Sequence, residues 1–563
     1  MPVDPLMRPA VTSQEPPAGE REQTPAERAG ATPLNPELFR EHAAQAAARA
    51  ESQPQSLLNE QALSEQARSS GEDFAVVRRK KRPSHLAQRR SRLAYKPWLI
   101  SAGCCVVLSL LFAVAGYSFQ SDIKESAAPE SPLVLATSLF SARRVAEVVV
   151  RPVAARNLQT VLEPILADAP ANTCLQVRDS NNAVFSFQAS QPLVPASNLK
   201  LVVAAAALDL LDANARLSTK FSTDGKATDG STVQGNLYVL GGGDPVLSTA
   251  SFAARPDRAG QVFTDLDKVA DQIYDSGIRT ITGSIVGDAS RHDDLRGVES
   301  WPDRYTEQGQ VAPLSALLVN DGVDGSGAIV KDPTLHAAAV LTELLRSRGI
   351  KVQSEPKVGV APKNATELIQ VDSPTVGELV TEAVRFSDNT TTEMLVKEIG
   401  LAEGGTGTTA AGVAALSKWV ADSSLPAEGV SFVDGSGLSP DDRVTCAFLS
   451  SLLAEGGSES AIATSLAVPG QAGTLDERFL SEPLRSSLRA KTGTLLQVTA
   501  LSGWLATAAQ KNLGFSLLIN TGSRNVNASD LTTQREVLQA LLTYPDAPPL
   551  DTLVPAAPEP PKG

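Results

Sequence analysis

Hydrophobic and polar residues alternate in two short segments near residue 180, and an apolar segment follows them. TCLQVRDS, from Thr173, and NAVFSFQAS, from Asn182, are typical of two strands joined by a turn. The next segment, LKLVVAAAALDLL from Leu199, has the alanine and leucine content of a buried helix. A second strand pair, from Val498, and an amphipathic helix, from Asp530, close the pattern. Strand pairs from both ends with helices between them predict an α+β domain whose antiparallel sheet joins the two ends.

A longer apolar run stands before these elements. Trp98 to Phe119 contains no charged residue and is long enough to cross a bilayer as a helix. Lys and Arg gather between residues 78 and 96, which predicts a single-pass anchor with a cytoplasmic N-terminus and an external C-terminal part. Small residues around Ala115 resemble a signal-peptidase site, but the preceding region is unusually long for a signal peptide. We therefore expect an uncleaved anchor.

Composition sets the other boundaries outside the folded part. Residues 1–97 are rich in Pro, Glu, Gln, Ala and Ser, which predicts a disordered cytoplasmic region that ends in the basic cluster. We assign residues 120–155 to a linker and residues 546–563 to an unstructured, proline-rich tail. The folded part is therefore expected between residues 156 and 545.

Charge and cysteine content exclude several classes of function. The net charge of −13 argues against a nucleic-acid partner, because phosphate binding needs a basic face. Four histidines and no C-x-x-C pair argue against a metal site, and we expect no metal and no cofactor. Cys104 and Cys105 fall in the apolar run. Cys174 and Cys446 are either a disulfide or two separate buried thiols, and the sequence does not distinguish these alternatives.

Three short motifs carry the candidate chemistry. Ser197 and Lys200 are spaced S-x-x-K, so on a helix they would share a face. The same spacing occurs at Ser121 and Ser354, so alone it is a weak signal. However, Ser387-Asp388-Asn389 and Lys491-Thr492-Gly493 follow in the order S-x-x-K, S-D-N, K-T-G, which is a signature of class A β-lactamases and penicillin-binding proteins.

The residue types suit acyl transfer through a serine. A serine hydroxyl needs a base, and a lysine can serve when burial and nearby positive charge lower its pKa. We therefore assign Ser197 as the nucleophile and Lys200 as its base, with Lys491 as the second positive charge. Ser387 would relay a proton to the leaving nitrogen, and Asn389 would hold both Lys200 and the substrate amide.

The K-T-G segment is expected to bind the substrate. The hydroxyls of Thr492 and Thr494, with Lys491, would clamp a terminal carboxylate. Gly493 would let the substrate backbone lie close to the strand. The backbone N–H groups of Ser197 and Thr494 would form an oxyanion hole.

With these motifs, the chain resembles the class C low-molecular-mass penicillin-binding proteins, the D-alanyl-D-alanine carboxypeptidase/endopeptidase family. The resemblance spans residues 158–544 and includes LYVLGGGDPVL, APLSALLVND and VDGSGLSPDDRVT. It implies a serine β-lactamase/DD-peptidase-like transpeptidase domain, an antiparallel sheet flanked by helices. In this family a long insertion separates the first two motifs. Here the insertion would comprise residues 219–362 and be rich in β-strands. The catalytic domain would then comprise residues 156–218 and 363–545.

The resemblance also implies a function. The chain would act on peptidoglycan stem peptides through an acyl-enzyme on Ser197, β-lactams would acylate the same serine, and Leu438 would line the acyl pocket. One departure is Pro440, where family members often carry an arginine, and this leaves open a contact to the free end of the stem peptide. The alternatives are a β-lactamase or esterase of the same fold, or a non-catalytic envelope scaffold or penicillin sensor.

Overall fold

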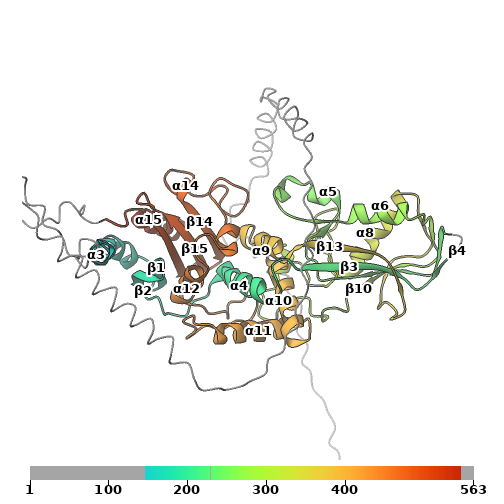
Figure 1. The fold of residues 1–563 in the computed structure, drawn as a ribbon, viewed down its shortest axis with the longest axis horizontal. Coiled ribbons are helices and arrows are strands. Elements are labelled where there is room, and N and C mark those ends of the chain that lie inside the picture. Colours follow the sequence, from blue (N-terminus) through green and yellow to red (C-terminus); the bar gives the residue numbers. More distant parts are fainter. Residues whose placement is uncertain (1–145, 229, 547–563) are drawn as a thin grey trace, which may run out of the picture. The chain divides into compact units, whose positions relative to one another are not determined.

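The structure, a computed structural model, describes residues 146–228 and 230–546 (Figure 1). The predicted disordered region 1–97, the apolar run 98–119 and the tail from residue 547 lie outside the described residues. Within the described ranges, no helix combines the length and the apolar character that crossing a bilayer requires.

A five-stranded antiparallel sheet joins the two ends of the described chain. Its strand order is β14-β15-β16-β1-β2. The strands are β1 (Asn172–Asp179), β2 (Asn182–Phe187), β14 (Leu488–Leu495), β15 (Val498–Ala506) and β16 (Asn512–Asn520). β1 pairs with β16 along its whole length, from Asn172 opposite Asn520 to Asp179 opposite Leu513. The sheet is therefore completed by both chain ends, as the two strand pairs in the sequence predict.

Alternation along the strands divides the core into two layers. Phe515 and Leu517 of β16 pack with helices α3 (Ala146–Ala167) and α15 (Ala528–Leu542). Leu518, with its side chain on the other face, packs with α4 (Lys200–Leu210) and α12 (Cys446–Gly456). Successive strand residues point to opposite faces, so one strand supplies both layers. Figure 1 shows helices on both sides of this sheet.

Helix α3 begins inside the segment 120–155 that we predicted to be a linker. The prediction is wrong from residue 146 onward, because Ala154, Leu158, Leu162 and Leu166 form one buried stripe against the sheet. The spacing of these residues is helical, and their apolar side chains pack in the core with α15.

A disulfide joins Cys174 of β1 to Cys446 of α12, with the Cα atoms 5.9 Å apart. Of the two alternatives that the sequence left open, the structure has the disulfide. It links strand β1 to the helix layer that also contains α4.

An inserted unit lies between α4 and α9 (Val376–Arg385). Its main sheet has the order β12-β10-β6-β3-β13, and a second sheet has the order β11-β9-β5-β4. The strands of both sheets and the short pair β7-β8 are β3 (Arg216–Thr223), β4 (Lys226–Thr228), β5 (Thr232–Gln234), β6 (Leu237–Leu240), β7 (Leu247–Ser248), β8 (Thr264–Asp265), β9 (Thr280–Ile281), β10 (Ile285–Asp288), β11 (Lys351–Val352), β12 (Lys357–Val358) and β13 (Thr366–Thr375). The unit extends beyond the predicted limits 219–362, because β3 and β13 pair antiparallel from residue 216 to residue 375.

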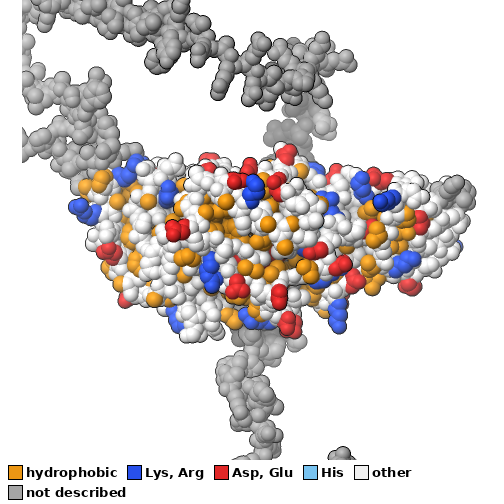
Figure 2. Space-filling view, turned by 90° about the horizontal axis from the view of Figure 1, so that it is seen from below, with side chains coloured by type: hydrophobic (Ala, Val, Ile, Leu, Met, Phe, Trp, Pro, Cys, Tyr) orange, Lys and Arg blue, Asp and Glu red, His pale blue; other side chains and the backbone are white. Residues whose placement is uncertain are grey.

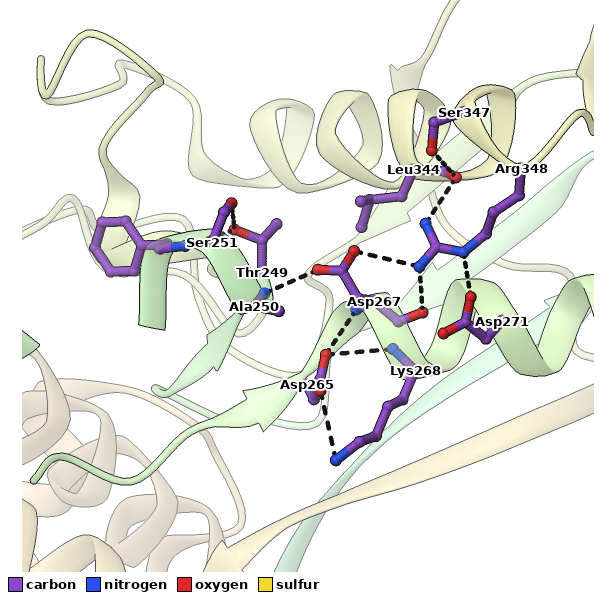
Figure 3. Close-up of polar contacts among 11 residues, drawn as sticks. Thr249, Ala250, Ser251, Asp265, Asp267, Lys268, Asp271, Leu344, Ser347 and Arg348 are labelled. Atoms are coloured by element: carbon purple, nitrogen blue, oxygen red, sulfur yellow. Dashed lines mark hydrogen bonds and ion pairs between the residues drawn. The ribbon is translucent and has the colours of Figure 1, made fainter. Parts of the chain in front are cut away.

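The inserted unit also contains helices, which the β-rich prediction left out. These are α5 (Ala250–Ala253), α6 (Leu266–Asp275), α7 (Arg304–Glu307) and α8 (Pro333–Ser347), with short 3-10 turns η2 (Pro256–Arg258) and η3 (Asn320–Gly322). Arg348, which follows α8, donates hydrogen bonds to Asp267 at 3.2 Å and Asp271 at 2.5 Å on α6 (Figure 3). These hydrogen bonds fix the end of α8 beside α6.

Three helices of the second half pack around α4: α10 (Asn389–Gly404), α11 (Thr409–Asp422) and α13 (Ala461–Ser465). The short helix α14 (Leu484–Ser487) packs instead in the layer of α3 and α15. On the face shown in Figure 2, Lys and Arg side chains are interspersed with Asp and Glu, and hydrophobic side chains lie between them.

Candidate active site

Ser197 and Lys200 lie where a short 3-10 turn, η1 (Ala196–Leu199), meets α4. The sequence predicts one helix for both residues; instead Ser197 belongs to η1 and Lys200 is the first residue of α4. Their side chains still meet, with 3.2 Å between Lys200 Nζ and Ser197 Oγ. Ser197 is partly exposed, whereas Lys200 is 1% exposed. The pair therefore combines an accessible hydroxyl with a buried amine.

The Lys200 amine is held by three oxygens. They are Ser197 Oγ at 3.2 Å, Asn389 Oδ1 at 2.6 Å and the Ser436 carbonyl at 2.6 Å. Burial lowers the pKa of Lys200 to about 8, because the charged ammonium loses its hydration, while the carboxyls of Asp434 and Glu393 act in the opposite direction. About a tenth of Lys200 is therefore neutral at pH 7 and able to accept a proton.

Lys491 forms a second buried contact with the S-D-N motif. Its Nζ donates to Ser387 Oγ at 2.8 Å and to the Thr492 carbonyl at 2.7 Å. Burial, and next the positive charge of Lys200, hold the pKa of Lys491 well below its ordinary value. The positive charge of Lys200 therefore disfavours the charged form of Lys491.

Local backbone geometry aims the S-D-N side chains at the two lysines. Ser387 has φ 61°, a left-handed conformation that is uncommon for a residue with a side chain. Asp388 caps α10 by accepting the Thr391 N–H at 3.0 Å, so Asn389 is the first residue of that helix. The cap fixes the direction in which Asn389 points toward Lys200.

Strand β14 is an edge strand, and one side of its backbone is available to a ligand. The Ala490 N–H donates to the Ala467 carbonyl at 3.0 Å, outside the sheet. Since backbone groups of alternate residues point to the same edge of an antiparallel strand, Thr492 and Thr494 direct their N–H groups to this outer side. Thr494 is exposed. This placement suits the predicted oxyanion donor at Thr494.

Gly493 has close neighbours within the protein itself. A Cβ at this position would lie 2.9 Å from Asn198 Nδ2 and 3.0 Å from the Pro195 carbonyl. The missing side chain therefore makes room for the protein's own η1 turn, and the predicted contact with a substrate backbone stays a prediction. Its effect is to let β14 pack closely against the segment that bears Ser197.

Leu438 is buried near this turn, and its predicted place in an acyl pocket stays a prediction. Its side chain is 3% exposed and packs in a small cluster with Tyr305, Val311 and Leu314 of the inserted unit. The preceding Gly437 has φ 78°, and a Cβ there would lie 2.0 Å from the Ala196 carbonyl. The Gly435–Leu438 loop therefore presses against the turn that bears Ser197.

The structure adds groups that the motifs did not reveal. The Gln310 carbonyl, from the inserted unit, accepts from Asn389 Nδ2 at 2.7 Å, so both ends of the Asn389 amide bind protein groups. Asp434 is buried and accepts hydrogen bonds from the Gly437 and Ser439 N–H groups, each at 2.7 Å. The backbone carbonyls of Gln310 and Ser436 have no signal in the sequence, because every residue has a carbonyl.

A pocket of about 290 Å³ opens beside these groups. Its lining includes Ser387 and Asn389 from the catalytic side and Phe252, Arg258 and Gln310 from the inserted unit. In the part of the chain that the structure describes, no cluster of three or more His, Cys, Asp or Glu is arranged to hold a metal ion.

Comparisons of the sequence and of the fold with known proteins agree with one another. The model of the D-Ala-D-Ala carboxypeptidase 3 (S13) family matches residues 155–326 and 324–543. A D-alanyl-D-alanine carboxypeptidase of Actinomadura sp. is 26% identical over 447 residues, which cover 65% of this chain and 80% of that protein. The crystal structure of penicillin binding protein 4 from Haemophilus influenzae has a TM-score of 0.59 at 19% identity, covering 68% of this chain and 99% of the other. The same protein complexed with a β-lactam has a TM-score of 0.56 at 19% identity with the same coverage.

Proposed function

Since this chain belongs to the D-Ala-D-Ala carboxypeptidase 3 (S13) family, we infer that it is a serine D-Ala-D-Ala carboxypeptidase, a penicillin-binding protein. The family predicted from the three motifs is thereby confirmed. The contact that carries the inference is the one between the buried Lys200 Nζ and Ser197 Oγ, at 3.2 Å. This is the arrangement that a lysine-activated serine nucleophile requires.

The proposed reaction begins with a proton transfer from Ser197 to neutral Lys200. The Ser197 oxygen then attacks the carbonyl carbon of the penultimate D-alanine, and the N–H groups of Ser197 and Thr494 stabilise the oxyanion. Collapse of this intermediate breaks the peptide bond and leaves an ester on Ser197. Ser387 passes its hydroxyl proton to the leaving nitrogen and takes one in return from Lys491, whose Nζ donates to it. Water then hydrolyses the ester and releases the shortened peptide.

Two features support peptidoglycan stem peptides as substrates and β-lactams as inhibitors. The first is the family, whose relative in Actinomadura is named a D-alanyl-D-alanine carboxypeptidase. The second is the outer side of β14, where Lys491 and the hydroxyls of Thr492 and Thr494 would bind the terminal carboxylate. A β-lactam presents a carboxylate and a strained amide, and would acylate Ser197 as a substrate mimic.

The proposed function predicts two reactions of the purified full-length chain. With a peptide that ends in D-Ala-D-Ala, one equivalent of D-alanine should be released for each peptide cleaved. With benzylpenicillin, a slowly hydrolysed acyl-enzyme should accumulate. Rapid penicillin hydrolysis without D-alanine release would instead identify a β-lactamase, and neither reaction in a folded sample would identify a scaffold or sensor.

We also propose that residues 98–119 anchor the chain with the enzyme on the cell-wall side. The uncharged run and its basic N-terminal flank support this topology. The Cys174–Cys446 disulfide also supports it, because such bonds persist in oxidising compartments. Protease added to intact spheroplasts should digest the catalytic part and spare a tag at the N-terminus. A digested tag, or an enzyme released from the membrane fraction, would contradict this topology.

A further inference from the structure

The Ser436 carbonyl that holds Lys200 is itself held by a buried carboxyl. Glu393 Oε1 accepts the Ser436 N–H at 2.7 Å and the Gly435 N–H at 3.0 Å. The Ser436 carbonyl in turn accepts from Lys200 Nζ at 2.6 Å. A chain of hydrogen bonds therefore runs from Glu393, through the backbone at Ser436, to the amine beside Ser197.

Helix α10 presents Glu393 and Asn389 on the same side. The two residues are four positions apart, about one helical turn, and so lie above one another on the helix. Asn389 reaches Lys200 directly at 2.6 Å, and Glu393 reaches it through Ser436. One rigid element thus fixes two of the three oxygens around the lysine.

We propose that Glu393 is a positioning residue for the reaction, which holds the Ser436 carbonyl where it fixes Lys200 against Ser197. This inference rests on the proposed role of Lys200 as the base. Glu393 itself contacts neither Ser197 nor the outer side of β14 in any hydrogen bond among the described residues. Its action is therefore on the lysine, through the backbone.

The burial of Glu393 fits a role beyond packing. The residue is fully buried, and its second oxygen, Oε2, has no hydrogen-bond partner among residues 146–228 and 230–546. A buried acceptor without a partner is unfavourable. A packing role alone would be served by an apolar side chain, whereas holding two N–H groups requires an oxygen at this place.

Glu393 also contributes charge near Lys200. The carboxyls whose charges raise the pKa of Lys200 are those of Asp434, Glu393, Asp388 and Asp442. The charge of Lys200 in turn lowers the pKa of Lys491. Burial and the charge of Asp434 raise the pKa of Asp442 to about 10. Burial, then Asp434, raise the pKa of Glu393 to about 7, so its charge changes within the working range of the enzyme. Removal of this charge should lower the pKa of Lys200.

Two substitutions separate position from charge. Glu393→Gln keeps an oxygen for the two N–H groups but removes the charge, whereas Glu393→Ala removes both. The measurement is the second-order rate constant for acylation of the full-length chain by benzylpenicillin, from pH 5.5 to 9.5. For Glu393→Ala we expect a plateau rate lower by about 10- to 100-fold, because a displaced base loses its alignment. For Glu393→Gln we expect a plateau close to that of the wild type and an acid limb moved to lower pH by roughly one unit.

A control distinguishes this role from a general loss of stability. Glu382→Ala removes a similarly buried carboxyl, on α9, that accepts the Val262 N–H at 3.2 Å and has no bond to the Ser436 loop. Its folded fraction should be acylated with a plateau close to that of the wild type. If Glu393→Ala keeps both the plateau and the acid limb, or if Glu382→Ala loses as much rate, the inference is overturned. If Glu393→Ala does not fold, an unchanged acid limb in Glu393→Gln overturns it. Failure of the wild type to be acylated would instead overturn the proposed function.

Discussion

Replacement of Ser197 by alanine is expected to abolish the release of D-alanine from a D-Ala-D-Ala peptide. We expect kcat to fall by on the order of 10⁴-fold or more, since loss of the nucleophile removes the covalent route altogether. Among the hydrogen bonds of the described residues, Ser197 supplies the only hydroxyl bonded to the Lys200 amine. The measurement is the initial rate of D-alanine release at saturating peptide, with the melting temperature as a check on folding.

Ser354→Ala is a matched control for this substitution. Ser354 begins the other S-x-x-K sequence in the folded part, but it lies before β12 in the inserted unit, and its lysine, Lys357, is in that strand. The Ser354 N–H donates to the Gly283 carbonyl at 3.3 Å, and the segment forms no helix. The control should retain the wild-type rate. Retention of more than about a tenth of the wild-type rate by Ser197→Ala would exclude Ser197 as the nucleophile.

Replacement of Lys200 by alanine should lower the acylation rate by about 10²- to 10⁴-fold, the usual contribution of a positioned general base. In the wild-type enzyme, the need for Lys200 should appear as a dependence of the acylation rate on pH. The active form of Lys200 is the neutral amine, whose fraction grows as pH rises through its pKa of about 8. Acylation should therefore increase with pH and level off above that value, and at pH 6 it should be about 100-fold below the plateau.

The pH profile distinguishes Lys200 from a lysine that has no role in the reaction. Lys357→Ala, which removes an exposed lysine of the inserted unit, should leave both the rate and the profile unchanged. A flat profile between pH 6 and 9 in the wild type, or an unchanged acid limb in Lys200→Ala, would exclude Lys200 as the base that limits acylation.

The hairpins and the three motifs could be predicted from the sequence because they are local. The alternation of Leu175 and Val177 on one face of β1 and Cys174 on the other is visible in the sequence, and so is the strand pair near the C-terminus. The order of S-x-x-K, S-D-N and K-T-G is equally local. These features predicted the layered sheet and the family.

What could not be predicted depends on contacts between distant segments. Cys174 and Cys446 are 272 residues apart, and only their 5.9 Å Cα separation distinguishes a disulfide from two thiols. The approach of Pro195 and Asn198 to Gly493 is of the same kind, because the sequence shows that a glycine is present but not what occupies the space. The packing of Leu438 likewise depends on an inserted segment more than a hundred residues earlier in the chain.

The most direct measurement for the central claim is mass spectrometry of the full-length chain after incubation with benzylpenicillin. The account predicts one penicilloyl group per chain, located by peptide mapping on the peptide that contains Ser197 and absent from Ser197→Ala. An adduct on another serine, such as Ser387, or no adduct in a sample that remains folded, would contradict the claim that Ser197 is the nucleophile.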